Sequence, residues 1–168
     1  MSQKKIEFKL KKMTEGDIPE LTEVMKRAFD DDAQKHLGQE RGGPPGYDDG
    51  EFFRTWLLPY EESVGYKIIS SDKIIGGIIV WILPEGHNIL GTIFVDPDSQ
   101  DMGVGRNTWR FIEDTYPETV SWRLGTPTWA TKNHSFYVKC GFERVEVDPL
   151  IPAEEGMTIY RKGMKRGS

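Results

Sequence analysis

The sequence predicts a mixed α+β fold in which one sheet is mostly antiparallel and contains a single parallel step. Three strand-like runs, residues 66–70, 73–83 and 87–95, are separated only by short turn signals, which favours an antiparallel meander. The next strand-like run, residues 120–124, follows a helix-like stretch at 104–116. A helix between two strands is typical of a crossover connection, and crossovers join parallel strands.

The first third of the chain supplies a strand and two helices. Alternating apolar and charged residues at 6–10 predict a half-buried strand. Apolar residues at helical spacing predict helices at 18–29 and 52–57. A capping-box-like pair precedes each of them, Thr14 with Asp17 and Asp48 with Glu51. Polar residues and glycine–proline pairs at 30–50 predict a loop, with a short helical turn at 34–37 as an alternative.

The last third of the chain completes the sheet. Residues 133–140 predict a last helix, and Gly141 is placed to end it in the left-handed conformation. Two more strands are expected at 142–147 and 157–161. Because no repeat or linker interrupts the chain, we expect residues 1–168 to form one domain.

The composition narrows the classes of protein to consider. The chain has 168 residues and a formal net charge of -5, so a general nucleic-acid binder is not expected. Cys140 is the single cysteine, which excludes a disulfide framework and fits a reducing compartment. The start lacks the apolar core of a signal peptide, and the longest apolar run, 74–83, is too short for a membrane span. We therefore expect a cytoplasmic protein without a membrane partner; the scattered His36, His87 and His134 propose no metal site.

A glycine-containing turn at residues 100–105, Gln-Asp-Met-Gly-Val-Gly, is the strongest functional signal in the chain. It follows the apolar run 89–95 and the stop signal Asp96-Pro97, and it precedes a helix-like stretch. A helix that begins after such a turn leaves main-chain N–H groups without partners at the positive end of its dipole. Gly103 and Gly105 lack the Cβ atom that would keep a phosphate away from the main chain. We therefore expect a phosphate-bearing ligand here.

Two common phosphate motifs do not fit this turn. A Walker A loop requires Gly-Lys-Ser/Thr, but Gly105 is followed by Arg106 and Asn107. A dinucleotide fingerprint requires a third glycine or an alanine where Thr108 stands, and it opens its fold. The turn therefore does not favour a GTPase or a dehydrogenase.

Two motifs resemble those of the GNAT superfamily of acyl-coenzyme-A-dependent N-acetyltransferases. The first is the run Ile93-Phe94-Val95-Asp96-Pro97 that leads into residues 100–105, a turn of the form Gln/Arg-x-x-Gly-x-Gly/Ala. The second is the run from Phe136 to Phe142, which contains the family's Tyr-x-x-x-Gly-Phe signature. The resemblance covers nearly the whole chain in element order. It implies a GNAT-like fold with a central, mostly antiparallel seven-stranded sheet, one splayed parallel pair and about four flanking helices.

The resemblance also implies that acetyl-coenzyme A is the acyl donor. The main chain of 93–95 would pair with the pantetheine arm, and the amides of 102–106 would hold the pyrophosphate. Family members often carry an asparagine where Ala130 stands; Asn133 either has a related role or caps the last helix. The implied cofactor-binding residues are Ile93, Phe94, Val95, Gln100, Asp101, Met102, Gly103, Val104, Gly105, Arg106 and Asn133.

The resemblance assigns Tyr137 as the catalytic acid that protonates the departing thiolate, whereas a tyrosine beside Phe136 could also be a core anchor. Cys140 is expected to be a small packing residue. A protonated amine must lose a proton before it can attack, but the sequence does not identify the base. The candidates are Asp96, Glu85, His87 and, through water, an acid of the run from Asp30 to Asp32.

The acceptor side leaves a weaker signal. Residues 30–49 hold five aspartates and one glutamate against Lys35 and Arg41. Together with Phe52, Phe53, Trp56 and Trp129, this acidic segment is expected either to attract a cationic amine or to be an ordinary solvated loop.

The sequence therefore predicts transfer of an acetyl group from acetyl-coenzyme A to an amine of a small molecule, peptide or protein, by direct attack in a ternary complex. The alternative is a non-catalytic acyl-coenzyme-A-binding or regulatory module of the same fold. Acyl transfer to a hydroxyl also stays open, because fold and cofactor do not fix the acceptor. The expected assembly is a monomer or a homodimer, with the strand edge at 157–161 available for pairing.

Overall fold

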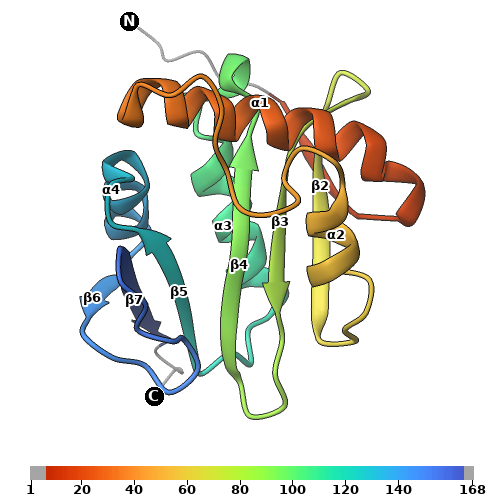
Figure 1. The fold of residues 1–168 in the computed structure, drawn as a ribbon. Coiled ribbons are helices and arrows are strands. Elements are labelled where there is room, and N and C mark those ends of the chain that lie inside the picture. Colours follow the sequence, from red (N-terminus) through yellow and green to blue (C-terminus); the bar gives the residue numbers. More distant parts are fainter. Residues whose placement is uncertain (1–6, 165–168) are drawn as a thin grey trace, which may run out of the picture.

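The computed structural model describes residues 7–164, which contain a seven-stranded sheet and four α-helices (Figure 1). The strands are β1 (Lys9–Lys12), β2 (Ser63–Ser70), β3 (Lys73–Trp81), β4 (His87–Val95), β5 (Ser121–Pro127), β6 (Glu143–Val145) and β7 (Met157–Gly163). The helices are α1 (Ile18–Leu37), α2 (Glu51–Trp56), α3 (Val104–Thr115) and α4 (Thr131–Lys139), with 3-10 turns η1 (Glu15–Asp17) and η2 (Pro97–Ser99). Along the sheet the strand order is β1-β2-β3-β4-β5-β7-β6.

The pairing confirms the predicted meander and the predicted parallel step. β2, β3 and β4 pair antiparallel in succession, and β4 pairs parallel with β5. The parallel register covers only His87–Ile89 of β4 against Ser121–Arg123 of β5. Beyond these residues both strands continue without pairing to each other, so the sheet splays toward the carboxyl ends of β4 and β5 (Figure 1).

Two helices cover each face of the sheet. α1 and α2 bury Leu21, Met25 and Phe53 against β3 and β4, whose Ile79 and Phe94 belong to the same core cluster. α3 and α4 pack on the other face, where the core cluster includes Trp109, Ile112, Trp122, Leu124 and Tyr137. Figure 1 shows α1 crossing the sheet at the carboxyl end of β4, with its last turns toward α4. This crossing places the end of α1 beside the splayed strands.

The expected loop at 30–50 is wrong in its first part. α1 continues through residue 37, and the turn considered at 34–37 is part of this same helix. Ala33 is fully buried, and an ion pair of 2.9 Å between Lys35 Nζ and Asp31 supports the extension at i, i+4 spacing. The helix ends at Gly38, whose φ of 63° suits a residue without a Cβ. Its mostly polar last turns hid the helical period in the sequence.

The two capping pairs behave differently. Thr14 and Asp17 form the predicted capping box, with the Thr14 N–H donating to Asp17 Oδ2 at 2.7 Å, but the box opens η1, which runs into α1. Asp48 does not cap α2: Gly50 occupies the N-cap, and Asp49 Oδ1 accepts from the Glu51 N–H at 3.0 Å.

The ends of several elements shift by a few residues. The strand expected at 6–10 is observed at Lys9–Lys12, and Ile6 lies outside the described residues. Gly141 follows the end of α4 as predicted. Within residues 7–164, none of the helices combines the length and the apolar character that crossing a membrane requires.

Candidate functional site

The end of β4 is tied to α1 through Asp96. Asp96 Oδ2 accepts from the Arg27 guanidinium at 2.6 and 3.1 Å, and Oδ1 accepts from the Asp98 N–H at 3.0 Å. The second bond caps η2, the 3-10 turn that redirects the chain toward α3. Both carboxylate oxygens of Asp96 therefore serve the structure, which favours the structural interpretation of this residue over a general base.

The turn after η2 exposes a run of main-chain N–H groups. α3 begins at Val104 and has Gly103 as its N-cap. The Asn107 N–H donates to the carbonyl oxygen of Gly103 at 3.0 Å, which is the first main-chain hydrogen bond of the helix. The N–H groups of residues 101–106 make no hydrogen bond with any other described residue. Unpaired amides at a helix N-terminus bind anions, so these residues fit a phosphate group.

The two positions 103 and 105 of the turn require glycine for different reasons. Gly103 has a φ of 79°, and a Cβ built there would meet only Asn107 Nδ2, at 3.6 Å. Gly103 therefore serves the backbone conformation of the turn and leaves its outer side open. A Cβ at Gly105 would lie 3.0 Å from the ring of Phe136. Close packing of α3 on α4 thus explains why residue 105 is a glycine. The sequence had instead suggested that this glycine lets a phosphate approach the main chain.

Gln100 connects the turn to both sides of the splay. Its Nε2 donates to Val95 O at 2.9 Å, and its Oε1 accepts from Lys132 Nζ of α4 at 2.5 Å. The side chain of Gln100 thereby holds the end of β4 and the start of α4 together. Contact between Gln100 and a pyrophosphate stays a prediction.

The edge of β4 that faces β5 is free of strand pairing from Leu90 to Val95. On the same strand the Phe94 ring is buried 6.2 Å from Phe53, and the side chains of Ile93 and Val95 are half-buried. A ligand at this edge would meet the main chain, as a strand added to a sheet does. An extended arm that carries amide groups, such as pantetheine, fits this edge.

Tyr137 lies in α4 with its ring in the core. The ring centroid is 5.4 Å from Phe136, 5.9 Å from Phe142 and 6.0 Å from Tyr160, and the residue is 8% exposed. The hydroxyl makes no hydrogen bond with any described residue. Burial raises the pKa of Tyr137, and the electrostatic effects of Cys140 and then of Asp32 raise it further. The phenol therefore keeps its proton at neutral pH, as a proton donor must.

Asp32 is the aspartate of the acidic segment that interacts with α4. Burial raises its pKa, while the nearby charges of Lys132 and His36 oppose that rise. Asp30 instead accepts from the Tyr47 hydroxyl at 2.6 Å and from the Gly42 N–H at 3.2 Å, and Asp31 pairs with Lys35. Asp30 and Asp31 thus have local partners, which leaves Asp32 as the acid of this run beside the splay.

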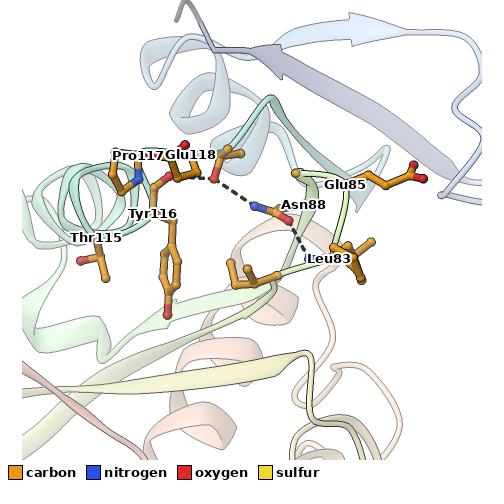
Figure 2. Close-up of a pocket in the computed structure, with 11 residues that line it drawn as sticks. Leu83, Glu85, Asn88, Thr115, Tyr116, Pro117 and Glu118 are labelled. Carbon is orange, nitrogen blue, oxygen red and sulfur yellow. Dashed lines mark hydrogen bonds between the residues drawn. The ribbon is translucent and has the colours of Figure 1, made fainter.

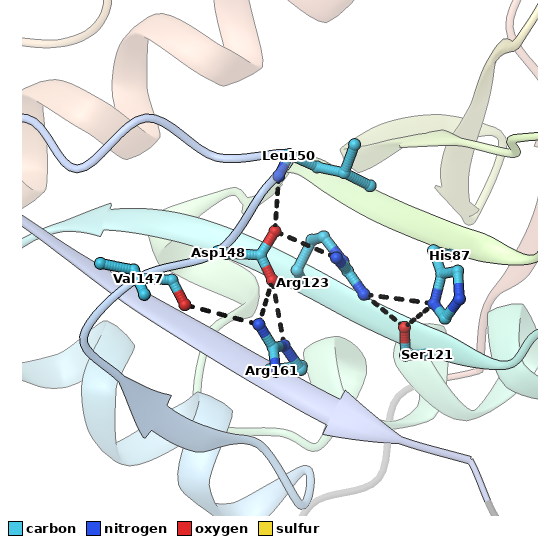
Figure 3. Close-up of polar contacts among 7 residues, drawn as sticks. All are labelled: His87, Ser121, Arg123, Val147, Asp148, Leu150 and Arg161. Carbon is cyan, nitrogen blue, oxygen red and sulfur yellow. Dashed lines mark hydrogen bonds and ion pairs between the residues drawn. The ribbon is translucent and has the colours of Figure 1, made fainter.

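A largely buried polar cluster lies along the short stretch where β4 and β5 pair (Figure 3). Arg123 NH1 donates to Asp148 Oδ1 at 3.0 Å, while its NH2 donates to Ser121 Oγ and reaches His87 Nδ1 at 3.4 Å. The Arg161 guanidinium donates to Asp148 Oδ2 at 2.7 and 3.0 Å. Because a guanidinium only donates, His87 Nδ1 acts as an acceptor within this cluster. That role engages the nitrogen and argues against His87 Nδ1 as a general base.

The structure also places the other residues that the sequence singled out as candidates for the site. Asn133 does not cap α4, because Ala130 is the N-cap; Asn133 Nδ2 donates to Thr126 Oγ1 at 3.4 Å. Burial raises the pKa of Cys140 to about 11, consistent with a packing thiol. Phe52 and Phe53 lie in the core, and their contact with an acceptor stays a prediction. Trp56 and Trp129 are 42% and 40% exposed, as an acceptor contact requires.

A separate hollow lies away from the glycine turn. A cavity of about 310 Å³ sits between the β3–β4 connection and the segment after α3, and Figure 2 shows Leu83, Asn88, Tyr116 and Glu118 around it. Asn88 accepts from the Leu83 N–H at 2.7 Å and donates to Thr119 Oγ1 at 2.9 Å. These bonds join the two segments. Since Asn88 is the second residue of β4 and the glycine turn follows the end of this strand, roughly 20 Å of strand separates the cavity from the turn.

Sequence reasoning missed Lys132 and the pair of Arg123 with Asp148. Lys132 had one local signal: it is a cation in the first turn of a helix, where acids are favoured. Arg123 stands in a strand whose neighbours are buried, which is unusual for a charged residue. Neither signal identifies a partner, because the partners lie 32 and 25 positions away in the chain.

Comparisons with known proteins agree with this geometry. The model of the acetyltransferase (GNAT) family matches residues 21–142. YrkN of Bacillus subtilis, an uncharacterized protein, is 35% identical over 135 residues, which are 79% of this chain and 71% of YrkN.

Solved structures share the fold at low identity. The PaiA N-acetyltransferase of Thermoplasma acidophilum, in complex with coenzyme A, superposes with a TM-score of 0.74 at 16% identity, over 95% of this chain and all of that one. The ribosomal-protein-S18-alanine N-acetyltransferase of Escherichia coli gives 0.73 at 16% identity, over 96% and 97%. On the family match and the identity to YrkN, the chain belongs to the acetyltransferase (GNAT) family and is an N-acetyltransferase.

Proposed function

We propose that the enzyme transfers an acetyl group from acetyl-coenzyme A to an amine by direct attack in a ternary complex. The observation that carries the proposal is the continuity of two unpaired main-chain surfaces. The free edge of β4 leads through η2 into the turn whose amides, at 101–106, have no partner among the described residues. An acyl pantetheine with a diphosphate at its far end matches both surfaces in order.

The proposed donor contacts follow from this continuity. The main chain of Ile93, Phe94 and Val95 would pair with the pantetheine arm. The amides of the turn, with Gln100 at its start, would hold the pyrophosphate. Asn133, in the first turn of α4, would contact the arm from the opposite side of the splay. Holding both reactants in a reactive geometry can account for about 7–11 kcal/mol of the barrier.

Tyr137 is proposed as the acid of the reaction. The amine nitrogen forms a bond to the thioester carbonyl carbon, the carbon–sulfur bond breaks, and the sulfur takes a proton from the Tyr137 hydroxyl. The nitrogen, which carries a positive charge after the attack, releases a proton, and the phenolate of Tyr137 regains one through solvent. Its unbonded, protonated hydroxyl supports this role. A thiol of pKa about 8.5 is already a fair leaving group, so the acid contributes a moderate part of the rate.

Asp32 is proposed to take the proton of the amine through water. Only about one alkyl amine in a thousand is neutral at pH 7, so the site must remove a proton. The charge of Asp32 contributes to the raised pKa of Tyr137, which supports a position of this carboxylate on the same side of the site as the proposed acid. The raised pKa of Asp32 makes it a better base than an ordinary aspartate.

The proposed acceptor is a cationic amine of a small molecule or a peptide. The excess of negative charge at 30–49 and the exposed rings of Trp56 and Trp129 support this class. Acetylation rates of polyamines, aminoglycosides and peptide amines at rising ionic strength test it. The rate at limiting amine should fall with salt for the true acceptor, and salt-independent rates for every class would contradict a cationic acceptor.

Thiol release from acetyl-coenzyme A in the presence of a pooled amine panel tests the activity itself. We expect amine-dependent thiol release by the wild type. Tight coenzyme A binding without turnover on any amine would instead favour a non-catalytic binding module. No heat on titration with coenzyme A would contradict the proposed donor.

A further inference from the structure

We propose that Lys132 binds the pyrophosphate of coenzyme A, reaching the glycine turn from α4 on the opposite side of the splay. The inference rests on the proposed function and adds a charged ligand to a site otherwise made of main-chain amides. Lys132 Nζ already lies 2.5 Å from Oε1 of Gln100, the first residue of the turn. A short movement of this flexible side chain would carry its ammonium from the Gln100 oxygen to a phosphate oxygen.

The turn needs a cation from elsewhere. Within residues 100–105 the single charged side chain is Asp101, which is negative and exposed, and Arg106 follows in the first turn of α3. A pyrophosphate adds further negative charge, so the turn alone would place it beside a carboxylate with one guanidinium to compensate. Lys132 supplies the second positive charge from a different element.

Lys132 has no carboxylate partner of its own. Among the described residues it forms no ion pair, whereas Arg27, Lys67, Arg161 and Lys162 each pair with an acid within 3 Å. The charge of Lys132 acts on Asp32, but these two residues form no ion pair or hydrogen bond with each other. Lys132 instead donates to the neutral side-chain amide of Gln100. A phosphate oxygen can take the place of this amide oxygen and form a stronger, charge-assisted hydrogen bond with Lys132.

The place of Lys132 within its helix does not favour a cation. It lies in the first turn of α4, which contains no acidic residue, so its charge adds to the positive end of the helix dipole. Lys139 occupies the last turn of the same helix, where a cation is favoured, and is likewise exposed. This contrast makes Lys139 a matched control for charge, helix and exposure.

Calorimetric titration of coenzyme A tests the proposal without any acceptor or turnover. Lys132→Met should raise the Kd about tenfold, the effect of losing one charged hydrogen bond. Lys132→Arg should keep most of the affinity, and Lys139→Met should leave the Kd unchanged. The Kd of the wild type should also rise more steeply with salt than that of Lys132→Met. Salt screens the attraction between Lys132 and the phosphate, and the variant lacks this attraction. The Tm of the ligand-free Lys132→Met variant should not fall.

Dephospho-coenzyme A, which lacks the 3′-phosphate, identifies the phosphate concerned. We expect Lys132→Met to weaken binding of both ligands equally. A loss confined to coenzyme A would overturn the assignment to the pyrophosphate. Equal affinities of the wild type and Lys132→Met would overturn the role of Lys132, while the proposed function would stand. Failure of the wild type to bind coenzyme A would contradict the proposed function itself.

Discussion

Removing the hydroxyl of Tyr137 distinguishes a catalytic role of this residue from a role in packing. Tyr137→Phe keeps the ring contacts with Phe142 and Tyr160 and removes only the unbonded hydroxyl. We expect kcat to fall about 10- to 100-fold, because proton transfer to the leaving thiolate is lost, with little change in the KM of acetyl-coenzyme A. Steady-state kinetics with the best amine of the panel measures both constants.

The matched control for Tyr137→Phe removes a hydroxyl that has a structural partner. The Tyr66 hydroxyl bonds that of Tyr116 at 2.7 Å on the same face of the sheet. Tyr66→Phe should lower stability slightly and leave kcat unchanged. If both variants lose activity equally, Tyr137 is only a core anchor and the acid role is wrong.

Asp32 should determine the acid side of the pH–rate profile. A base must be deprotonated to act, and burial raises the pKa of Asp32. As the pH falls, activity should therefore begin to decline at a higher pH than it would if the base were an ordinary aspartate with a pKa of about 3.9. Asp32→Asn should lower kcat about 100-fold and remove this decline. The profile of kcat against pH between 4 and 9 measures the effect, and an unchanged profile in the variant would rule out Asp32.

At the scale of elements, the packing of α3 on α4 depends on the missing side chain at Gly105. Gly105→Ala would place a methyl group 3.0 Å from the Phe136 ring, which has to move. Since Phe136 precedes Tyr137 in α4, we expect weaker coenzyme A binding and a loss of stability of about 1–3 kcal/mol. Denaturation and calorimetric titration measure the two effects.

A second substitution tests the cause of that loss. Phe136→Leu makes room beside residue 105, so the double variant should be more stable than the two separate losses predict. Strictly additive losses would show that the contact with Phe136 is not what requires glycine at this position.

The order and type of the elements could be predicted because they depend on local signals. Short turns specified the meander of β2, β3 and β4, and the helix at 104–116 specified the parallel step. The end of α1 could not be predicted in this way. Its last turns are stabilised by the buried Ala33 and the Asp31–Lys35 pair within a mostly polar stretch, where no apolar period marks the helix.

At the scale of the whole molecule, the motifs indicated where the site lies but not what surrounds it. Unpaired amides at 101–106 follow from the turn and the helix start, which are contiguous in the sequence. The approach of Lys132 and Asp32 depends on how α4 and α1 cross the sheet, and no spacing encodes that crossing. Helical spacing likewise does not tell which face a helix buries, so the burial of Phe52 and Phe53 in the core could not be read from the sequence.

The stability of the whole molecule should depend on Asp148, which joins three segments. Its fully buried carboxylate accepts from Arg123 of β5, Arg161 of β7 and the Leu150 N–H. Asp148→Asn keeps the shape but leaves Arg123 buried without its counter-charge, so the free energy of unfolding should fall by about 3–5 kcal/mol. Urea denaturation measures the change, and Glu51→Gln, which breaks the exposed pair with Arg54, should change it far less.

The pH dependence of stability gives an independent check on Asp148. Burial alone would raise its pKa, but the bonds from Leu150, Arg161 and Arg123 together lower it. A lowered folded-state pKa means that the stabilisation is present above the ordinary aspartate pKa of about 3.9 and is lost as the pH falls through the folded-state value. Urea midpoints measured from pH 6 down to pH 2 should therefore fall less steeply for Asp148→Asn than for the wild type. Parallel curves would show that the ionised Asp148 does not hold β5 and β7 to the segment around residue 150.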